Sequence, residues 1–284
     1  LRIHRQGSRV ERWFAVGGMA DGALHYRLMT LGMAGFANLL GAGIPMPVAL
    51  PPNDFSSAAE WIFQRAGCVV QSYPSIAVRI AAAALEKGLD LSGTTFLVAG
   101  EALTGAKRAV IQRAGAEAYP SYPITEIGPV GYACRQMNSG NCVHLFSDSI
   151  AVISHRQRAP LTEVEVDALL FTTLLPFAPH VLINAEMGDT GIIEPARCDC
   201  LLSRVGFTRQ VRDIGSYGKL TGQGMTLVGT EVGRILEEIL PAQLGGSPGD
   251  YQLVEREGGI QTQLSLRVSP RTGLSSPQTA QECF

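Results

Sequence analysis

The sequence carries little net charge and few charged residues, which argues against several classes of partner. Lysine and arginine together number 23 and aspartate and glutamate 25, so the formal net charge is -2 and the pI is near 6.2. Proteins that bind nucleic acid or an anionic membrane through electrostatics normally carry a basic stripe or a polybasic cluster. This sequence has neither, so we expect no nucleic-acid partner and no membrane partner.

A secretion signal and an unbroken apolar run are also lacking. The stretch LRIHRQGSRVERWF is basic but has no apolar signal-peptide core behind it, which favours a cytoplasmic protein. The most apolar stretch, LMTLGMAGFANLLGAGIPMPVAL, is interrupted by Asn38, by glycines and by two prolines. We therefore predict that it forms a buried helix, a glycine turn and a strand, rather than a membrane span.

Glycine and proline are plentiful, as are hydrophobic residues. The 284 residues include 32 glycines and 16 prolines, and 46% are hydrophobic, so the chain can bury a sizeable core between many turns. From residue 55 to 122, strand patterns alternate with helix patterns. Strands are predicted in CVVQSY, TTFLVAG and AEAYPSY, and helices in SSAAEWIFQRAG, PSIAVRIAAAALEKGL and TGAKRAVIQRAG. This alternation predicts an α/β fold with a parallel sheet and crossover helices.

The pattern changes twice further along the chain. After Cys134, alternating segments without helices predict a β-rich antiparallel region that continues to about Asp213. The remainder reads β-α-β-β and ends in a polar tail, RTGLSSPQTAQECF. We therefore predict a large domain over residues 1–213, followed by the start of a small α+β lid domain over residues 214–284.

The stretch SYPITEIG, which follows the last predicted parallel strand, contains three residues suited to nucleotide chemistry. Tyr122 offers an aromatic face to a planar base, the Thr125 hydroxyl can donate to a phosphate oxygen, and the Glu126 carboxylate suits Mg²⁺. Ligands of open α/β sheets bind beyond the carboxyl ends of the strands, as this placement requires. The alternative is that Thr125 caps an ordinary helix and Glu126 fills its first turn.

Four ordered motifs over residues 96–219 resemble the adenylate-forming superfamily, which includes acyl-CoA synthetases and luciferases. Gly100-Glu101 follows a strand, and Tyr122-Pro123-Ile124-Thr125-Glu126 resembles the family's Tyr-Gly-x-Thr-Glu, with proline in place of glycine. The stretch NAEMGDTGII resembles the segment in which an aspartate, here Asp189, holds the ribose hydroxyls. VRDIGSYGKL resembles the hinge segment, with Arg212 near the ribose and Asp213 as the pivot.

The resemblance implies a fold and a reaction. GYAC, LLFTTLLP and the cysteine pair of RCDC are similar to phenylacetate-CoA ligases and coenzyme F390 synthetase-like proteins within that superfamily. ATP would activate a small-molecule carboxylic acid as an acyl-adenylate, with loss of pyrophosphate, and a thiol such as coenzyme A would take the acyl group. Glu126 would position Mg²⁺, Thr125 would bind a phosphate oxygen, and Gly100, Glu101, Tyr122, Asp189 and Arg212 would hold ATP or AMP.

Cysteines and a histidine suggest a metal site as well. Cys198 and Cys200 form a tight C-x-C, and without a secretion signal such a pair favours a metal over disulfides. Together with Cys134 and His144 they would give the Cys₃His set of a structural Zn²⁺. Cys142, two residues before His144, is the alternative to Cys134. A further alternative is that the thiols are free and buried and the histidine is exposed.

Two absences favour an incomplete or divergent copy with very slow or absent adenylate formation. The stretch HRQGSRVERWFAVGG holds no Ser/Thr-Gly-Thr-Thr-Gly phosphate loop, and Ser92–Thr95 (SGTT) leads directly into a strand. The closing segment with the family's catalytic lysine is not seen either, and Lys219 is no clear substitute. The rival hypothesis is a non-catalytic, zinc-stabilised module that binds a nucleotide or acyl group. The sequence leaves open whether the chain forms a homodimer. Lys107-Arg108 is interpreted as the polar face of a helix.

Overall fold

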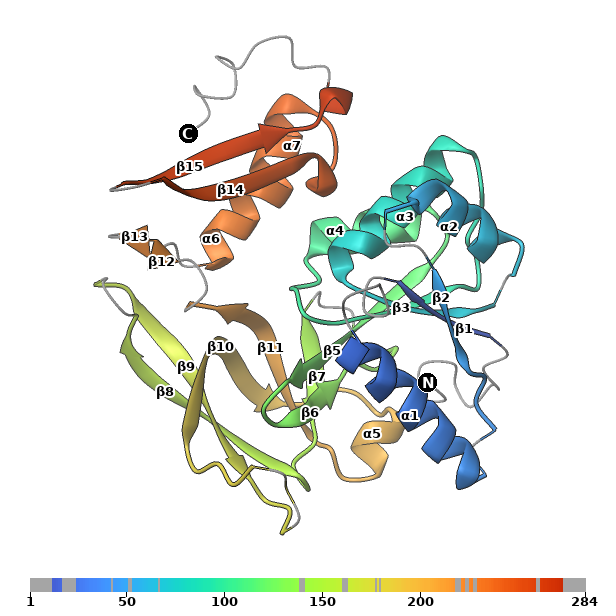
Figure 1. Ribbon diagram of the computed structural model, residues 1–284. Coiled ribbons are helices and arrows are strands. Elements are labelled where there is room, and N and C mark those ends of the chain that lie inside the picture. The colour runs from blue at the N-terminus through green and yellow to red at the C-terminus, as the bar shows by residue number, and fades with distance from the viewer. Residues whose placement is uncertain are drawn as a thin grey trace.

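The computed structural model of the protein describes residues 12–16, 24–41, 43–50, 53–65, 67–137, 141–159, 163–176, 178, 180–217, 221–222, 225–226, 229–258 and 261–272. An α/β part, a β-rich part and a smaller C-terminal α+β part follow one another along the chain (Figure 1). Lys219 and the end of the predicted polar tail, residues 273–284, lie outside the described residues.

The α/β part confirms the predicted parallel sheet. Its strands are β1 (Trp13–Val16), β2 (Pro47–Leu50), β3 (Val69–Ser72), β4 (Thr95–Val98) and β5 (Glu117–Ile124), paired in parallel in the order β2-β1-β3-β4-β5. The helices are α1 (Leu24–Leu39), α2 (Phe55–Phe63), α3 (Pro74–Glu86) and α4 (Gly105–Arg113). The apolar stretch around Asn38 thus forms helix α1 and strand β2, as predicted, but the prediction that the helix is buried is wrong, because Leu28, Phe36 and Leu39 are 61%, 63% and 82% exposed and Ala34 alone is buried among the described side chains of α1. Among the described helices, none combines the length and apolar character that a membrane crossing requires.

Local sequence explains where these helices begin. The Asp54 carboxylate accepts a hydrogen bond from the Ser57 backbone N–H at 2.9 Å and so caps α2. Pro74 occupies the first turn of α3, where its missing N–H costs nothing. Thr104 caps α4 through the Lys107 N–H. Buried side chains of α2, α3 and α4 and of the strands beneath them form one apolar cluster, which includes Ile62, Val70, Ile80, Phe96 and Ile111.

Strand β5 joins the parallel region to the antiparallel region of a single eleven-stranded sheet. Its first half, to Pro120, pairs in parallel with β4, and its second half, from Ser121, pairs antiparallel with β6. The sheet continues in the order β6-β7-β11-β10-β9-β8. These strands are β6 (Gly128–Tyr132), β7 (Cys142–Leu145), β8 (Ile150–Arg158), β9 (Glu165–Thr173), β10 (Ala185–Pro195) and β11 (Arg209–Ser216), with the short helix α5 (Leu201–Arg204) before β11.

This β-rich part has an apolar cluster of its own, which includes Tyr122, Val143, Leu145, Phe171 and Val211. The prediction of antiparallel strands after Cys134 is therefore confirmed. The candidate site lies where the two parts of the sheet meet, around β5.

The C-terminal part follows the predicted β-α-β-β order. Two short strands, β12 (Thr221–Gly222) and β13 (Met225–Thr226), precede a helical run and a hairpin. The helical run is α6 (Gly229–Arg234), the π-helix η1 (Ile235–Ile239) and α7 (Leu240–Leu244), and the 3₁₀ turn η2 (Pro248–Asp250) follows it. The hairpin is β14 (Tyr251–Gly258) and β15 (Gln261–Val268), followed by the 3₁₀ turn η3 (Pro270–Thr272). In Figure 1 the helical run faces α4 of the α/β part.

Candidate functional site

Gly100 lies just beyond the carboxyl end of β4, beneath the ring of Tyr73. Its backbone has a φ of 83°, in the left-handed region that glycine adopts without strain. A Cβ atom added at this position would lie only 2.7 Å from Cε1 of Tyr73. Glycine is therefore required here both by the backbone conformation and by the close approach of the tyrosine ring.

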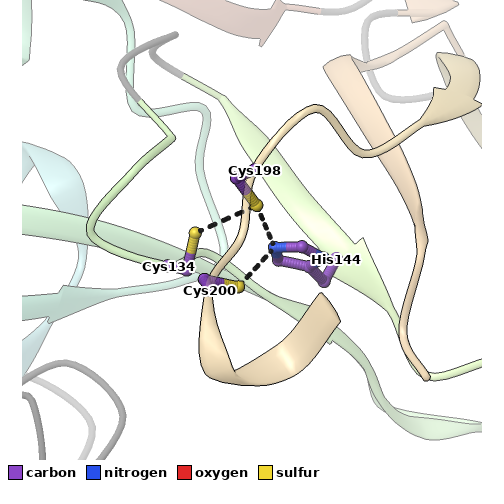
Figure 2. A group of neighbouring side chains, drawn as sticks. All are labelled: Cys134, His144, Cys198 and Cys200. Carbon is purple, nitrogen blue, oxygen red and sulfur yellow. Dashed lines mark hydrogen bonds between the residues drawn. The ribbon is translucent and has the colours of Figure 1, made fainter. Parts of the chain in front are cut away.

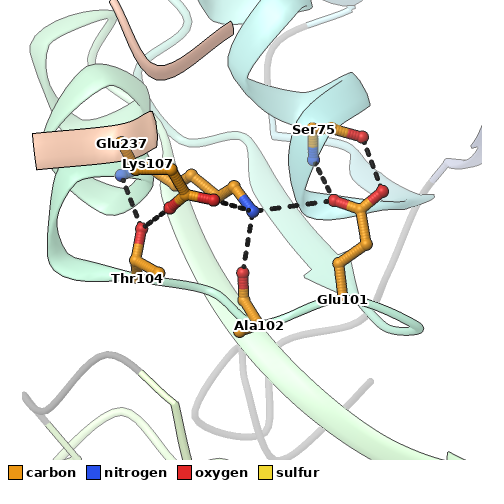
Figure 3. Close-up of polar contacts among 6 residues, drawn as sticks. All are labelled: Ser75, Glu101, Ala102, Thr104, Lys107 and Glu237. Carbon is orange, nitrogen blue, oxygen red and sulfur yellow. Dashed lines mark hydrogen bonds and ion pairs between the residues drawn. The ribbon is translucent and has the colours of Figure 1, made fainter. Parts of the chain in front are cut away.

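The Glu101 carboxylate contacts the first turn of helix α3. Its carboxylate accepts hydrogen bonds from the Ser75 backbone N–H at 3.0 Å and from the Ser75 hydroxyl at 2.8 Å (Figure 3). A carboxylate at a helix N-terminus satisfies free N–H groups and interacts favourably with the helix dipole. The Lys107 ammonium lies 3.7 Å away from the same carboxylate. Glu101 thus positions α3 at the edge of the candidate site, and its contact with a nucleotide remains a prediction.

Tyr122 and Asp189 are in direct contact although 67 residues separate them. The Tyr122 hydroxyl donates a hydrogen bond to Oδ2 of Asp189 at 2.7 Å, from β5 to β10. The Tyr122 ring is only 9% exposed and packs edge-on against Phe171, with 6.3 Å between ring centroids. Burial, and then the Asp189 charge, raise the pKa of Tyr122, so its hydroxyl stays protonated as a donor.

Thr125 and Glu126 form a tight turn between β5 and β6. The Ile127 N–H donates to the Ile124 carbonyl at 3.1 Å, and both Thr125 and Glu126 are exposed. The interpretation of Thr125 as a helix cap is wrong, because an antiparallel strand follows the turn. Nδ1 of His180 lies 3.1 Å from the Glu126 carbonyl, which ties a distant loop to this turn. The predicted phosphate and Mg²⁺ contacts of the two side chains stay predictions.

Arg212 and Asp213 lie side by side on β11, next to β10. Nε of Arg212 is 3.2 Å from the Glu194 carboxylate, and its Nη1 contacts the carboxylate of Asp213. Asp213 has a φ of 53°, one of two positive values among the described non-glycine residues. A left-handed residue within a strand is unusual and marks a local bend in the backbone. The bend lies at Asp213, the residue that the sequence resemblance predicts to be the hinge.

The four predicted metal ligands converge on one point (Figure 2). Cys134 follows β6, His144 lies on β7, and Cys198 and Cys200 immediately precede α5. Sγ of Cys198 is 3.8 Å from Sγ of Cys134, and Nε2 of His144 is 3.2 Å from Sγ of both Cys198 and Cys200. All four ligand atoms lie within 4.8 Å of one another. The described residues place Cys134, and not Cys142, in this group.

The arrangement fits a closed tetrahedral zinc site. Zinc bound to thiolates at about 2.3 Å separates two sulfur ligands by about 3.8 Å, the spacing that Cys134 and Cys198 have here. His144 is fully buried, and its Nδ1 lies 2.8 Å from the Phe207 carbonyl. An Nδ1–H donated to this carbonyl leaves the lone pair of Nε2 directed at the sulfur atoms, as in metal-bound histidines. The alternative that His144 is exposed is therefore wrong, whereas the Zn²⁺ itself stays a prediction.

The pKa values of Cys134 and Cys200 are shifted in opposite directions. Burial raises the pKa of Cys134 to about 12. Burial also acts against ionisation of Cys200, but hydrogen bonds from the Ser203 backbone and from Cys134 and Cys198 outweigh it, so its pKa is lowered. Cys200 therefore forms the thiolate, the form that binds a metal, more readily than Cys134 does.

Lys107 and Arg108 do not form a solvated helix face, which corrects the interpretation from sequence. Lys107 is only 9% exposed and forms an ion pair with Glu237 at 2.8 Å. Arg108 donates to the Ala118 carbonyl at 2.9 Å. Burial of Lys107 depends on a partner that lies 130 residues further along the chain, which the local helix pattern cannot reveal.

The solved structures that share this fold include CoA ligases and synthetases. 2-Hydroxyisobutyryl-CoA ligase in the postadenylation state, in complex with 2-HIB-AMP, matches with a TM-score of 0.63 and 19% identity, over 97% of this chain and 58% of that chain. The same ligase in an open conformation, with 2-HIB-AMP and CoA, gives 0.55 and 17%, over 97% and 62%. O-succinylbenzoate coenzyme A synthetase from Bacillus subtilis, in complex with ATP and magnesium ion, gives 0.52 and 13%, over 98% and 56%.

These likenesses confirm the predicted fold. The chain spans 56–62% of the length of these ligases. No protein-family model and no curated protein matches the sequence. The large α/β and β-rich sheet followed by a small α+β part is the adenylate-forming ligase fold.

Proposed function

We propose that this chain takes part in ATP-dependent activation of a carboxylic acid and its transfer to a thiol such as coenzyme A. A carboxylate oxygen attacks the α-phosphorus of ATP, the bond to pyrophosphate breaks, and an acyl-adenylate forms. The thiol sulfur then attacks the acyl carbon, and AMP leaves. The observation that carries the proposal is the Tyr122–Asp189 contact, at the strand where the sheet changes from parallel to antiparallel.

The residues have distinct proposed roles around that contact. Asp189 accepts hydrogen bonds from the ribose hydroxyls, and the Tyr122 hydroxyl holds its carboxylate in place beforehand. Thr125 and Glu126 lie in an exposed turn at the end of β5, where Thr125 can donate to a phosphate oxygen. The Glu126 carboxylate suits Mg²⁺, which when bound neutralises charge on the phosphates. Arg212, on the strand beside β10, supplies positive charge near the ribose.

The proposed substrates are small carboxylic acids, and aryl acids are the first class to test. The likeness of GYAC, LLFTTLLP and RCDC to phenylacetate-CoA ligases supports this choice. The solved ligases that share the fold act on 2-hydroxyisobutyryl and O-succinylbenzoyl groups, by their names, so aliphatic hydroxy acids belong in the same panel.

Calorimetry tests the nucleotide site directly. We expect AMP and ATP-Mg²⁺ to bind the wild-type chain, and Asp189→Ala to weaken AMP binding by roughly 5- to 150-fold, the value of about 1–3 kcal/mol for a hydrogen bond to a charged group. Tyr122→Phe should retain binding, because Asp189 keeps its charge. The matched control is Asp167→Ala, which removes an exposed carboxylate that lies on the neighbouring strand β9. Absence of binding to wild type at millimolar nucleotide would contradict the site.

A second function, a zinc-stabilised binding module without catalysis, is favoured by the buried Cys₃His group. Pyrophosphate release separates the two functions. Release with one or more acids of the panel, lost in Glu126→Ala and Asp189→Ala but retained in Asp167→Ala, supports the ligase. Nucleotide binding without release for any acid supports the binding module.

A further inference from the structure

The proposed nucleotide site has a ribose anchor at Asp189 but offers a base little aromatic surface at Tyr122. The Tyr122 side chain is only 9% exposed, because its ring packs edge-on against Phe171 and its hydroxyl is bound to Asp189. A base stacks on the face of an aromatic ring, so that face has to be accessible. A different aromatic residue near the same edge of the sheet has to supply it.

Tyr73 is an exposed aromatic residue at this edge. The exposed aromatic side chains in the described part of the chain are Phe36, Trp61, Phe63 and Tyr73. The first three lie on helices α1 and α2, whereas Tyr73 directly follows strand β3 at its carboxyl end. Ligands of open α/β sheets bind beyond the carboxyl ends of the strands. Among these four residues, only Tyr73 therefore has the position that a ligand contact requires.

The strand register places Tyr73 within reach of the ribose anchor. Ser72, the last residue of β3, pairs with Val98 of β4, and Val98 pairs with Pro120 of β5. Tyr73 follows Ser72 directly, and Tyr122 lies a short way beyond Pro120 on β5. Neighbouring strands are about 4.8 Å apart, so β3 and β5 are separated by roughly 10 Å. A nucleoside has a comparable length, so it can contact both strand ends at once.

The Tyr73 ring is held in place by the backbone of Gly100. A Cβ atom added at Gly100 would lie 2.7 Å from Cε1 and 3.0 Å from Cδ1 of Tyr73, so this edge of the ring rests on the glycine. The side chain is nevertheless 37% exposed. A ring that is already fixed on one side loses little conformational freedom when a base stacks on it, which favours binding.

We propose that Tyr73 is the residue on which the base of the nucleotide stacks, while Asp189 binds the ribose. This inference rests on the proposed function and adds a contact to the same site. Tyr122 then acts through Asp189, whereas Tyr73 touches the ligand itself. Stacking acts on the base alone, so it contributes affinity for a nucleotide but none for a ribose phosphate.

Calorimetry on the full chain, with AMP and with ribose 5-phosphate, which lacks the base, tests this role. Tyr73→Leu keeps an apolar side chain beside Gly100 but has no aromatic face. It should weaken AMP binding by roughly 5- to 150-fold, the range for the loss of one base stack, and leave the affinity for ribose 5-phosphate unchanged. Tyr73→Phe should bind AMP as the wild type does, because it keeps the ring.

Fluorescence gives a second readout that does not require a measurable affinity for ribose 5-phosphate. In Tyr73→Trp, AMP should quench indole fluorescence more than it does in the wild type, because the base stacks on the new ring. Ribose 5-phosphate at the same concentration should not. Quenching no greater than in the wild type would contradict the stack.

Phe63→Leu is the matched control, because it removes an exposed aromatic ring from the end of α2 that leads towards the start of β3. It should leave AMP binding unchanged. No side-chain hydrogen bond of Tyr73 caps α3, so the helix should persist in Tyr73→Leu, which circular dichroism checks.

The outcomes separate the stacking role from the proposed function. If the wild type binds AMP and Tyr73→Leu binds it equally well, the stacking role is wrong and the nucleotide site stands. Equal weakening of AMP and ribose 5-phosphate in Tyr73→Leu would show that Tyr73 only supports the local structure. If the wild type binds no AMP at millimolar concentration, the proposed function fails and the stacking role fails with it.

Discussion

His144 directs its two ring nitrogens at different kinds of atom. Nδ1 faces the Phe207 carbonyl oxygen, and Nε2 faces the sulfur atoms of Cys198 and Cys200. A buried histidine whose second ring nitrogen faces two sulfur atoms has the arrangement of a metal ligand. We therefore propose that one structural Zn²⁺ binds here and leaves no open coordination position for hydrolytic chemistry.

Loss of one ligand should remove the metal. We expect Cys198→Ser to lower the zinc content of the purified protein, measured by elemental analysis, from one ion per chain to well below one. The melting temperature should fall too, because metal binding contributes to folding. Cys142→Ser, which alters a buried cysteine on β7, the strand of His144, should keep its zinc. A wild-type protein without stoichiometric metal, or zinc loss only in Cys142→Ser, would contradict the ligand set.

Short sequence motifs identify the candidate residues that have distinctive chemistry. Cys198 and Cys200 are recognisable from their spacing, and the structure brings Cys134 and His144 to them. Tyr122 and Asp189 come from ordered motifs, but their direct contact depends on strands β5 and β10, which no local pattern pairs. The interpretation of Lys107 as part of a polar helix face is wrong, because its partner Glu237 comes from a distant helix. Residue types are thus readable from sequence, whereas long-range partners are not.

At the scale of elements, β5 shows which predictions the pattern supports. The sequence predicts a parallel strand for its first half, and the structure confirms it, since alternation with helices specifies that topology. Its second half turns back into β6, where the Pro123 and Gly128 positions and the Thr125-Glu126 turn replace the helix start considered from sequence. A hairpin and a helix cap use similar polar residues, so only strand pairing distinguishes them.

The close approach of β6 and β7 depends on a glycine. A Cβ atom added to Gly131 would lie 2.2 Å from the His144 carbonyl oxygen and 2.9 Å from Cγ2 of Val143. We expect Gly131→Ala to push the strands apart, to destabilise the chain by on the order of 1–3 kcal/mol and to lower zinc content through displacement of His144. Urea unfolding and elemental analysis measure both effects.

Gly105→Ala is the matched control for that substitution. No atom lies within 4 Å of the Cβ position at Gly105, and this residue begins α4, where alanine is the better helix former. Its stability should stay equal or rise slightly, and its zinc should be retained. Equal stability of Gly131→Ala and wild type would show that β6 and β7 can separate without cost.

In the described part of the molecule, two large apolar clusters lie beside a small third one, and strand β5 contributes side chains to both large clusters. The first lies between the parallel strands and helices α2 to α4, and the second lies among the antiparallel strands. Cys134 belongs to the second cluster, as does Cys200, while Cys198 packs against it. A metal at this group therefore cross-links the segment after β6, strand β7 and the segment before α5, all of which lie in the β-rich part.

Metal removal should therefore destabilise the β-rich part more than the α/β part. We expect a chelator to lower the melting temperature and to raise the amide exchange rates of β6, β7, α5 and β11, which the metal ligands hold or adjoin. Strands β3 and β4 and helix α3 should keep their protection, because their apolar cluster contains no metal ligand. The same chelator added to Cys198→Ser should cause no further change. Equal loss of amide protection in the α/β part and the β-rich part, or no loss in either, would show that the metal does not specifically stabilise the β-rich part.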